Sequence, residues 1–149
     1  MRAVLQRVSR ARVAVDGRTA GAIGTGLAVL LGVGAGDTER DAERIAEKIV
    51  NLRIFRDGAA LMNRSIRDAG GAVLLVSQFT LYGDARAGRR PSFSAAAKGD
   101  LAQTLYQRTG ASIARSGVPV EYGIFGASME LELVNDGPVT ILLDSKRVF

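Results

Sequence analysis

The segment at residues 72–76, AVLLV, constrains the fold of this chain more than any other stretch. It is a run of aliphatic residues with Gly70 and Gly71 before it and Gly83 shortly after it. A short apolar run between turn signals is typical of a β-strand that is buried on both faces. Its length argues against a helix, so the sequence predicts a central strand here.

The far end of this strand is polar. Ser77, Gln78, Phe79 and Thr80 follow the apolar run directly. We interpret these four residues as a functional site at a strand end. The alternative is that they only cap the edge of a sheet.

The composition is that of one folded domain spanning residues 1–149. Hydrophobic residues make up 47% of the chain and charged residues 23%, which excludes wholesale disorder and allows a substantial core. No apolar run approaches the about 18 residues that a membrane-spanning helix needs. The N-terminal apolar stretch is interrupted by Gln6 and Arg7, unlike a signal peptide. We therefore expect a cytoplasmic protein that does not enter a membrane.

The chain contains no cysteine and no histidine. A Ser-His-Asp triad, a Cys-His pair and a histidine-ligated zinc are therefore excluded within one subunit. If the protein is a hydrolase, its chemistry must come from backbone dipoles, carboxylates, lysines or the substrate. The formal charge of +5 favours an anionic partner such as a nucleic acid. We expect no metal and no cofactor.

The first part of the chain reads as strands followed by a helix. Alternating residues predict two strands within 2–15 that meet near Ser9-Arg10, and Asp16-Gly17 predicts a hairpin turn to a return strand at 19–23. An apolar strand is expected at 27–33. Apolar spacing then predicts a helix at 39–51, with Thr38 as its N-cap and Asp41 completing a capping box.

The second part reads as a helix followed by strands. We expect a helix at 98–116, ended by Gly117 and Pro119. Three closing strands are expected, the last two separated by the turn at 135–138; they span residues 118–122, 129–134 and 139–143. The resulting order of strands, helix, strand, helix and strands is neither a Rossmann alternation nor a repeat array.

Two glycine-rich loops resemble phosphate-binding loops only superficially. In the loop at 32–37, Asp37 stands where a dinucleotide-binding motif needs its last glycine. In the loop at 83–90, Arg89 and Arg90 replace the lysine and hydroxyl residue of a P-loop. Arg86, Arg89 and Arg90 are instead candidates for contacts to a nucleic-acid backbone. The alternative is that they are ordinary solvated arginines.

Two stretches taken together, VSQFTLYGD at 76–84 and LVNDGPVT at 133–140, resemble the bacterial D-aminoacyl-tRNA deacylases, or D-Tyr-tRNA deacylases. The resemblance continues through LQRVSRARV at 5–13, KIVNLRIF at 48–55 and RRPSF at 89–93, nearly from end to end. It implies a hydrolase that removes D-amino acids from mischarged tRNA. The expected fold is α/β, a single domain whose β-sheets form a barrel-like core with two helices packed on one side.

The resemblance also implies roles for particular residues. The Ser77, Gln78, Phe79 and Thr80 segment would line the pocket for the terminal aminoacyl-adenosine. A Gly137-Pro138 pair with a cis bond would reach into the pocket of the partner subunit of a homodimer, although local sequence statistics alone favour a trans bond.

Phe125 and Met129 match further pocket residues of the family. The residue before that methionine is Ser128, where the family usually has an acidic residue. This substitution would change the polarity near the pocket.

The missing histidine argues against a side-chain nucleophile. Thr80 would need an adjacent base, and none lies within the motif. We favour catalysis by the tRNA 2′-hydroxyl and a water, with backbone N–H groups near Phe79 and Thr80 stabilising the oxyanion.

The Gly137 and Pro138 carbonyls would accept hydrogen bonds from the substrate ammonium and leave no room for an L side chain. Because glycine has no side chain, glycyl-tRNA would also be accepted.

Two other functions fit the sequence. A non-catalytic tRNA-binding module would need aromatic residues among its basic ones, and only Phe93 lies close in sequence to the basic loop. A hydrolase of free D-aminoacyl esters would use the same pocket. Release of amino acid from charged tRNA, compared with release from a free ester, separates these functions.

Overall fold

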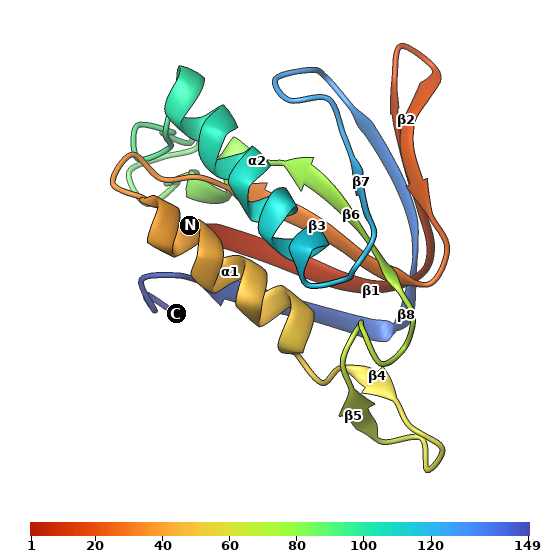
Figure 1. Cartoon of the computed structure of the whole chain (residues 1–149). Helices are drawn as coiled ribbons and strands as arrows, with labels where there is room; N and C mark the ends of the chain where they lie inside the picture. The colour runs from red at the N-terminus through yellow and green to blue at the C-terminus, as the bar shows by residue number, and fades with distance from the viewer.

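The computed structural model describes residues 1–149 as one mixed sheet with two helices packed against one of its faces (Figure 1). The elements in chain order are β1 (Arg2–Val15), β2 (Arg18–Ile23), β3 (Gly26–Gly32), α1 (Glu39–Asn51), β4 (Phe55–Arg56), β5 (Met62–Arg64), β6 (Ala72–Ser77), the 3₁₀ turn η1 (Phe79–Tyr82), α2 (Gly99–Arg115), β7 (Val120–Tyr122) and β8 (Glu130–Asp144).

The sheet runs in the order β2-β1-β3-β6-β7, and β8 pairs with the other edge of β1. The β6 strand lies between β3 and β7 and is parallel to both, which explains its unbroken apolar sequence. The β2 strand comes close to β7, because a Cβ at Gly21 would lie 2.7 Å from the carbonyl oxygen of Tyr122. The sheet is therefore nearly closed, and the predicted barrel-like α/β core is confirmed.

The β1 strand is continuous, so the prediction of two strands meeting near Ser9-Arg10 is wrong. β1 pairs with β3 over its first half, with β2 over its last part and with β8 over nearly its whole length. The register with β8 shifts on both sides of Val8. These bulges interrupt the in-out alternation, and the interruption mimics a strand boundary in the sequence.

The β8 strand is also continuous, which contradicts the two separate strands predicted at 129–134 and 139–143. Its pairing with β1 nevertheless departs where the turn was expected. Asn135 pairs with Val8 and Thr140 pairs with Gln6, so residues 136–139 bulge out of the ladder. The Gly137-Pro138 peptide bond within this bulge is cis.

The helices follow their predicted patterns closely. In α1 the stripe of Ala42, Ile45, Ala46 and Ile49 is buried, and Thr38 is the N-cap, its backbone N–H donating to the Asp41 carboxylate at 2.9 Å. The α2 helix begins and ends one residue inside the predicted 98–116.

Gly110 lies inside the continuous helix α2 for a packing reason. A Cβ at this position would lie 2.5 Å from the phenol oxygen of Tyr122. Glycine therefore lets β7 approach the helix, and this contact outweighs the lower helix propensity of glycine.

Two apolar cores hold the sheet and helices together. The larger one contains 23 buried residues from α1, α2 and the helix-facing side of the sheet. The smaller one contains seven buried residues on the opposite side of β1, β2, β3 and β6. No helix is both long and apolar enough to span a membrane.

A short hairpin projects from the body of the domain (Figure 1). It is formed by β4 and β5, which pair as an antiparallel ladder. The turn-rich sequence after Phe55 did not predict these strands. They are short, two and three residues, and lack the apolar alternation by which a strand is recognised.

Candidate active site

A cavity of about 530 Å³ opens where β6 ends. Nineteen residues line it, fourteen of them hydrophobic, and they come mainly from β3, β6, the start of α2 and the segment before β8. Five of the predicted site residues lie in this wall: Ser77, Gln78, Phe79, Phe125 and Met129. The structure thus brings together residues that are about 50 positions apart in the sequence.

The end of β6 creates the site because the chain turns sharply there. The Gln78 N–H donates to the Leu31 carbonyl at 2.8 Å and closes the β3–β6 ladder. The chain then enters the 3₁₀ turn η1, which starts at Phe79. Neither the Phe79 N–H nor the Thr80 N–H has an acceptor among the protein groups, as expected at the start of such a turn. Two adjacent backbone donors are therefore free beside the cavity.

The cavity wall is almost free of titratable groups. Lys98 and Tyr106 are its only titratable side chains, and the wall contains neither aspartate nor glutamate. The Tyr106 hydroxyl donates to the Leu75 carbonyl at 2.7 Å, and burial raises the pKa of Tyr106. No side chain in the wall is therefore suited to act as a general base near neutral pH.

Thr80 does not line the cavity. Its side chain is exposed, and its Oγ1 accepts a hydrogen bond from the Gln78 amide. No carboxylate or lysine forms a hydrogen bond with it. Thr80 thus lacks the activating base that a nucleophilic hydroxyl requires.

The basic loop after η1 is joined to the site through an aromatic contact. Phe79 is 56% exposed, and its ring packs edge-on against Phe93 with 5.1 Å between centroids. Two backbone hydrogen bonds of 2.8 Å between Asp84 and Ser92 close the base of the loop.

The three candidate arginines of this loop differ. Arg86 forms an ion pair with Asp84 at 2.6 Å, and its hydrogen bonds hold the pKa of that carboxyl well below the usual range. Arg89 and Arg90 are exposed and form neither ion pairs nor hydrogen bonds. Arg89 and Arg90 are therefore more available to an anionic partner than Arg86.

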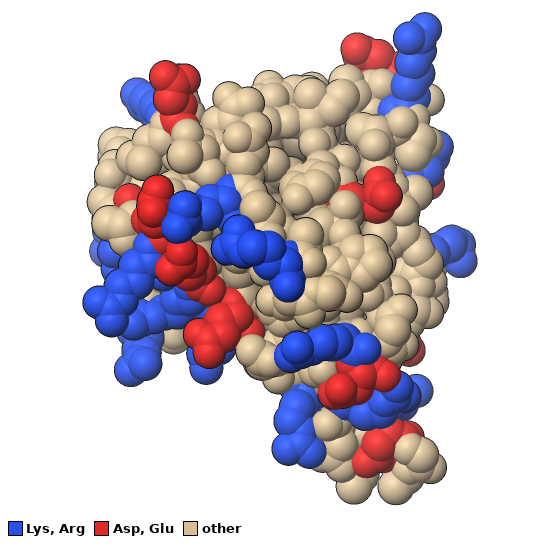
Figure 2. Space-filling model, in the orientation of Figure 1, with Lys and Arg blue, Asp and Glu red and all other residues tan.

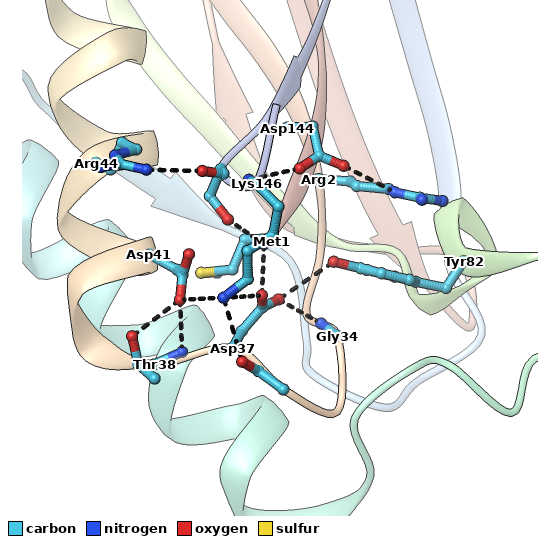
Figure 3. Close-up of polar contacts among 12 residues, drawn as sticks. Met1, Arg2, Gly34, Asp37, Thr38, Asp41, Arg44, Tyr82, Asp144 and Lys146 are labelled. Atoms are coloured by element: carbon cyan, nitrogen blue, oxygen red, sulfur yellow. Dashed lines mark hydrogen bonds and ion pairs between the residues drawn. The ribbon is translucent and has the colours of Figure 1, made fainter. Parts of the chain in front are cut away.

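A buried ion cluster contacts the last residue of η1, Tyr82 (Figure 3). The Asp37 carboxylate pairs with the α-amino group of Met1 at 2.8 Å. It also accepts hydrogen bonds from the Gly34 N–H at 2.6 Å and the Tyr82 hydroxyl at 3.2 Å. Tyr82 is the last residue of η1, and its pKa is raised by burial and by the Asp37 charge. Asp37 thus anchors the end of the site turn.

Arg2 holds the same turn from a second direction. Its guanidinium lies 4.6 Å from the centre of the Tyr82 ring and donates to the Leu81 carbonyl at 3.0 Å. Asp144 of β8 orients this guanidinium through a contact of 3.2 Å. The turn that carries Phe79 and Thr80 is therefore fixed by charged groups outside the cavity.

The cluster extends to the start of α1 and the end of the chain. Lys146 contacts the Asp41 carboxylate at 3.1 Å, and its ammonium lies 3.8 Å from Asp37. Burial alone would raise the pKa of Asp41, but polar neighbours, with the Ser145 hydroxyl first, then Thr38 and Lys146, hold it well below its usual value.

Gly137 and Pro138 are exposed and do not line the cavity of their own subunit. Their position is fixed by Arg7, which is only 2% exposed. The Arg7 guanidinium donates to the Asp136 carbonyl at 3.0 Å and lies 3.1 Å from the Asp136 carboxylate. It also donates to the Ile54 carbonyl at 2.6 Å. The bulge is therefore held rigidly although it lies at the surface.

Comparison with known proteins identifies the family. The family model described as D-Tyr-tRNA(Tyr) deacylase matches residues 4–144. The chain belongs to this family. It is 61% identical to a D-aminoacyl-tRNA deacylase from Koribacter versatilis and 57% identical to one from Anaeromyxobacter dehalogenans, each over the full length of both chains.

Solved structures share this fold. The c-Myc DNA unwinding element binding protein superposes with a TM-score of 0.91 at 39% identity, covering 97% of this chain and 98% of its own. A probable eukaryotic D-amino acid tRNA deacylase superposes with a TM-score of 0.80 at 18% identity, covering 95% and 97%. The second likeness extends the fold of the deacylase family to distant sequences.

Sequence reasoning missed three supports of this deacylase-family site. Asp37, Tyr82 and Arg7 were not candidates, because each acts through contacts with residues distant in sequence. The sequence offered no clear signal for Arg7, because Arg2, Arg10 and Arg12 lie in the same strand and only folding buries Arg7. Ser128 is exposed and lies outside the cavity wall.

Proposed function

We propose that this protein hydrolyses the ester bond of D-aminoacyl-tRNA, releasing a free D-amino acid and tRNA as a proofreading step of translation. Membership of the D-Tyr-tRNA(Tyr) deacylase family and the names of its full-length relatives support this proposal. The observation that carries the mechanism is a pair of free backbone donors beside a cavity without a general base. The cytoplasm, where tRNA is charged, is the proposed location.

The free N–H groups of Phe79 and Thr80 would stabilise the oxyanion that forms when a water attacks the ester carbonyl. Removing one such donor typically costs about 100-fold to 1,000-fold in rate. Gln78 and Ser77 would position the ester beside them. These four residues would act through backbone dipoles and orientation, which requires no activated side chain.

The proton transfers would fall to the substrate. The 2′-hydroxyl of the terminal ribose would take a proton from the attacking water as the new C–O bond forms. It would pass its own proton to the departing 3′-oxygen as the ester C–O bond breaks, so that the 2′-hydroxyl is regenerated. Proton transfer by a positioned group contributes typically about 100-fold to 10,000-fold. The absence of carboxylates from the cavity wall supports this assignment.

The remaining pocket residues would bind the aminoacyl-adenosine. Phe125 and Met129 lie in the apolar part of the cavity wall, where an adenine or an amino-acid side chain would pack. The exposed Phe79 ring would add a stacking surface.

A homodimer would complete the pocket. The outer edge of β8 pairs with no strand in the same chain, and Val134 and Leu142 expose large apolar side chains along it. A long edge strand of this kind favours association with a second copy about a twofold axis. Gly137 and Pro138 are fixed by Arg7 and exposed, as a loop that enters the partner's cavity would need to be.

Chiral selection would then be steric. The carbonyls of the partner's bulge would accept hydrogen bonds from the substrate ammonium and leave no room for a side chain on the L face of the α-carbon. Glycine has no side chain, so glycyl-tRNA would also be cleaved. Gly137 has a φ of 135°, a region that side chains disfavour, so a larger residue cannot replace it without strain.

The basic loop would contact the RNA backbone. Arg89 and Arg90 are unpaired and lie on a loop joined to Phe79 through Phe93. Arg86 is occupied by Asp84 and would contribute less. Each lost phosphate contact should lower the salt slope of binding by about one unit.

The test is release of amino acid from D-aminoacyl-, L-aminoacyl- and glycyl-tRNA, measured beside release from a free D-amino-acid ester. We expect cleavage of the D and glycyl tRNAs, no cleavage of the L form and poor cleavage of the free ester. A protein that binds charged tRNA but releases nothing would be a binding module. Equal rates on the free ester and the tRNA would assign a general D-ester hydrolase.

A further inference from the structure

The projecting hairpin carries an unusual set of arginines. We call residues 53–68 the arginine arm; it includes β4, β5 and the segments beside them. Figure 2 shows several Lys and Arg side chains, with Asp and Glu side chains among them, around this arm at the lower end of the view. Four exposed arginines lie on it: Arg53, Arg56, Arg64 and Arg67.

None of these four arginines pairs with a carboxylate, whereas Arg2, Arg7, Arg12, Arg86 and Arg108 all do. Arg53 donates to the carbonyl and side-chain oxygens of Asn63 at 2.7 and 3.1 Å. Arg64 donates to the Asp68 carbonyl. Arg67 donates to the Asn51 amide oxygen at 3.1 Å, and Arg56 has no partner. The arm therefore holds three guanidinium groups against neutral acceptors and leaves the fourth, that of Arg56, without a partner. None of the four charges is compensated by a carboxylate at contact distance.

The two aspartates of the arm accept hydrogen bonds from its own backbone and neighbouring side chains. Asp57 accepts hydrogen bonds from the Ala59 and Leu61 N–H groups at 2.8 and 3.0 Å and from the Asn63 amide at 2.7 Å. Asp68 accepts from the Ser65 N–H and hydroxyl at 2.9 and 2.7 Å. Both carboxylates thus stiffen the loop, and neither forms an ion pair with an arginine of the arm. The hydrogen bonds from Ser65, and then the nearby charges of Arg64 and Arg67, lower the pKa of Asp68.

The arm is joined to the Gly137-Pro138 bulge by one buried side chain. Arg7 donates to the Ile54 carbonyl at the base of the arm and to the Asp136 carbonyl in the bulge. The two features therefore hold a fixed relation. If the bulge enters the partner's cavity, the base of the arm lies beside that cavity too.

The chemistry of the arm fits a phosphate backbone. Guanidinium groups bind phosphate oxygens with two parallel donors. The only aromatic residue of the arm, Phe55, is buried, so the arm offers no surface for stacking unpaired bases. These features favour a double-stranded RNA segment over a single strand.

We propose that the arginine arm of one subunit contacts the phosphates of the acceptor-stem duplex of the tRNA whose 3′ end occupies the partner subunit's cavity. This inference rests on the proposed function and on the dimer described above. Each tRNA would then be held by both subunits, its ester in one cavity and its stem against the arm of the other.

The first test removes charge from the arm. Arg56→Gln combined with Arg67→Gln should raise KM for D-aminoacyl-tRNA by about 3-fold to 30-fold, leave kcat unchanged and lower the salt slope of tRNA binding by about two units. Arg40→Gln is the control, because Arg40 is also exposed and unpaired but lies on α1. Leu61→Asn, at the 60%-exposed tip, controls for the shape of the arm.

A short substrate separates this inference from the proposed function. A D-aminoacyl-CCA trinucleotide has no duplex, so the arm variant should cleave it as fast as the wild type does. Equal losses on both substrates, unchanged KM and salt slope on tRNA, or the same loss in Leu61→Asn would overturn the role of the arm. A wild type that cleaves neither substrate would instead refute the proposed function and this inference with it.

Mixed dimers test whether the arm acts across the interface. One subunit would carry the two arginine substitutions, and the other would carry Ala127→Trp to block its cavity. The open cavity then faces the intact arm of its partner, so KM should be normal. Placing all the substitutions in the blocked subunit should raise KM. The reverse pattern would show that the arm serves its own subunit and would overturn the proposal.

Discussion

The cavity at the end of β6 and the ion cluster around Asp37 contact the two ends of one 3₁₀ turn, at Phe79 and Tyr82, yet they differ sharply in composition. The cavity wall is mostly hydrophobic and contains a single cationic side chain. The cluster gathers Asp37, Asp41, Lys146 and the Met1 amino group within a few ångströms. Charge in this region is concentrated where it positions the turn, and the groups facing the cavity are backbone dipoles.

The difference has a physical reason. A carboxylate in the cavity would need a partner to offset its desolvation, and it would repel the anionic end of an RNA. Fixed N–H dipoles stabilise a developing oxyanion without either disadvantage. Their effect depends on rigidity, which the ion cluster supplies through Tyr82 and Arg2. The following predictions test whether the charged cluster fixes the turn while backbone dipoles and the substrate carry the chemistry, from the largest expected effect to the smallest.

Asp37→Asn should destabilise the protein most. It leaves the buried Met1 amino group without its carboxylate, and breaking a buried ion pair in this way costs about 3–5 kcal/mol. Urea unfolding of the variant measures the loss. Asp16→Asn, in an exposed turn where asparagine tolerates the positive φ of 49°, is the control and should stay near wild type. A loss of unfolding free energy below about 1 kcal/mol in Asp37→Asn would show that the cluster does not stabilise the turn.

A substrate lacking the terminal 2′-hydroxyl should be cleaved at least about 100-fold more slowly than the normal one, because the cavity supplies no base to replace that hydroxyl. Single-turnover deacylation of 2′-deoxy and normal D-aminoacyl-tRNA measures the ratio, with binding of both checked separately. Equal rates would mean that a protein group transfers the proton. The cavity would then contain a catalytic side chain, contrary to the contrast drawn between the two regions.

Gly137→Ala should lower kcat/KM by about 10-fold to 100-fold, the range expected when a positioning group shifts by about an ångström. A Cβ at Gly137 would lie 2.8 Å from Val139 Cγ2 and 3.0 Å from an Arg7 guanidinium nitrogen. Gly36→Ala is the matched control, since a Cβ there meets nothing within 4 Å. If the two variants keep equal activity, the bulge does not contribute to the site.

Asp41 should make the cluster sensitive to acid. Its pKa is lowered on folding, so the folded state binds fewer protons and the stabilisation is complete above the unfolded pKa of about 4. This stabilisation is lost as the pH falls below that value. Unfolding free energies measured from pH 7 to pH 3 should fall less steeply for Asp41→Asn. Parallel curves for variant and wild type would contradict this role.

Thr80→Ala should have the smallest effect, a change in deacylation of less than about fivefold, because the backbone N–H at this position is retained. The measurement is single-turnover deacylation with tRNA binding and stability recorded alongside. Abolished turnover with normal binding and stability would restore Thr80 as a nucleophile.

The sequence by itself determined the features that depend on neighbouring residues. The Asp16-Gly17 turn has positive φ at both positions, as its composition predicted. Both helices and the buried β6 strand lie where the periodicity and turn signals indicated. The lack of histidine and cysteine had already excluded several mechanisms. These inferences succeeded because turn geometry and amphipathic spacing are set within about ten residues of chain.

Only the tertiary structure decided which of these pieces became a site. Bulges against β8 made β1 look like two strands, and the β4–β5 hairpin had no periodic signal. The supports of the turn and of the bulge join residues far apart in sequence: Arg7 and Asp136 are separated by 129 positions, and Tyr82 and Asp37 by 45. A buried charge needs its partner in space, and a single sequence does not reveal which distant residue folding brings to it.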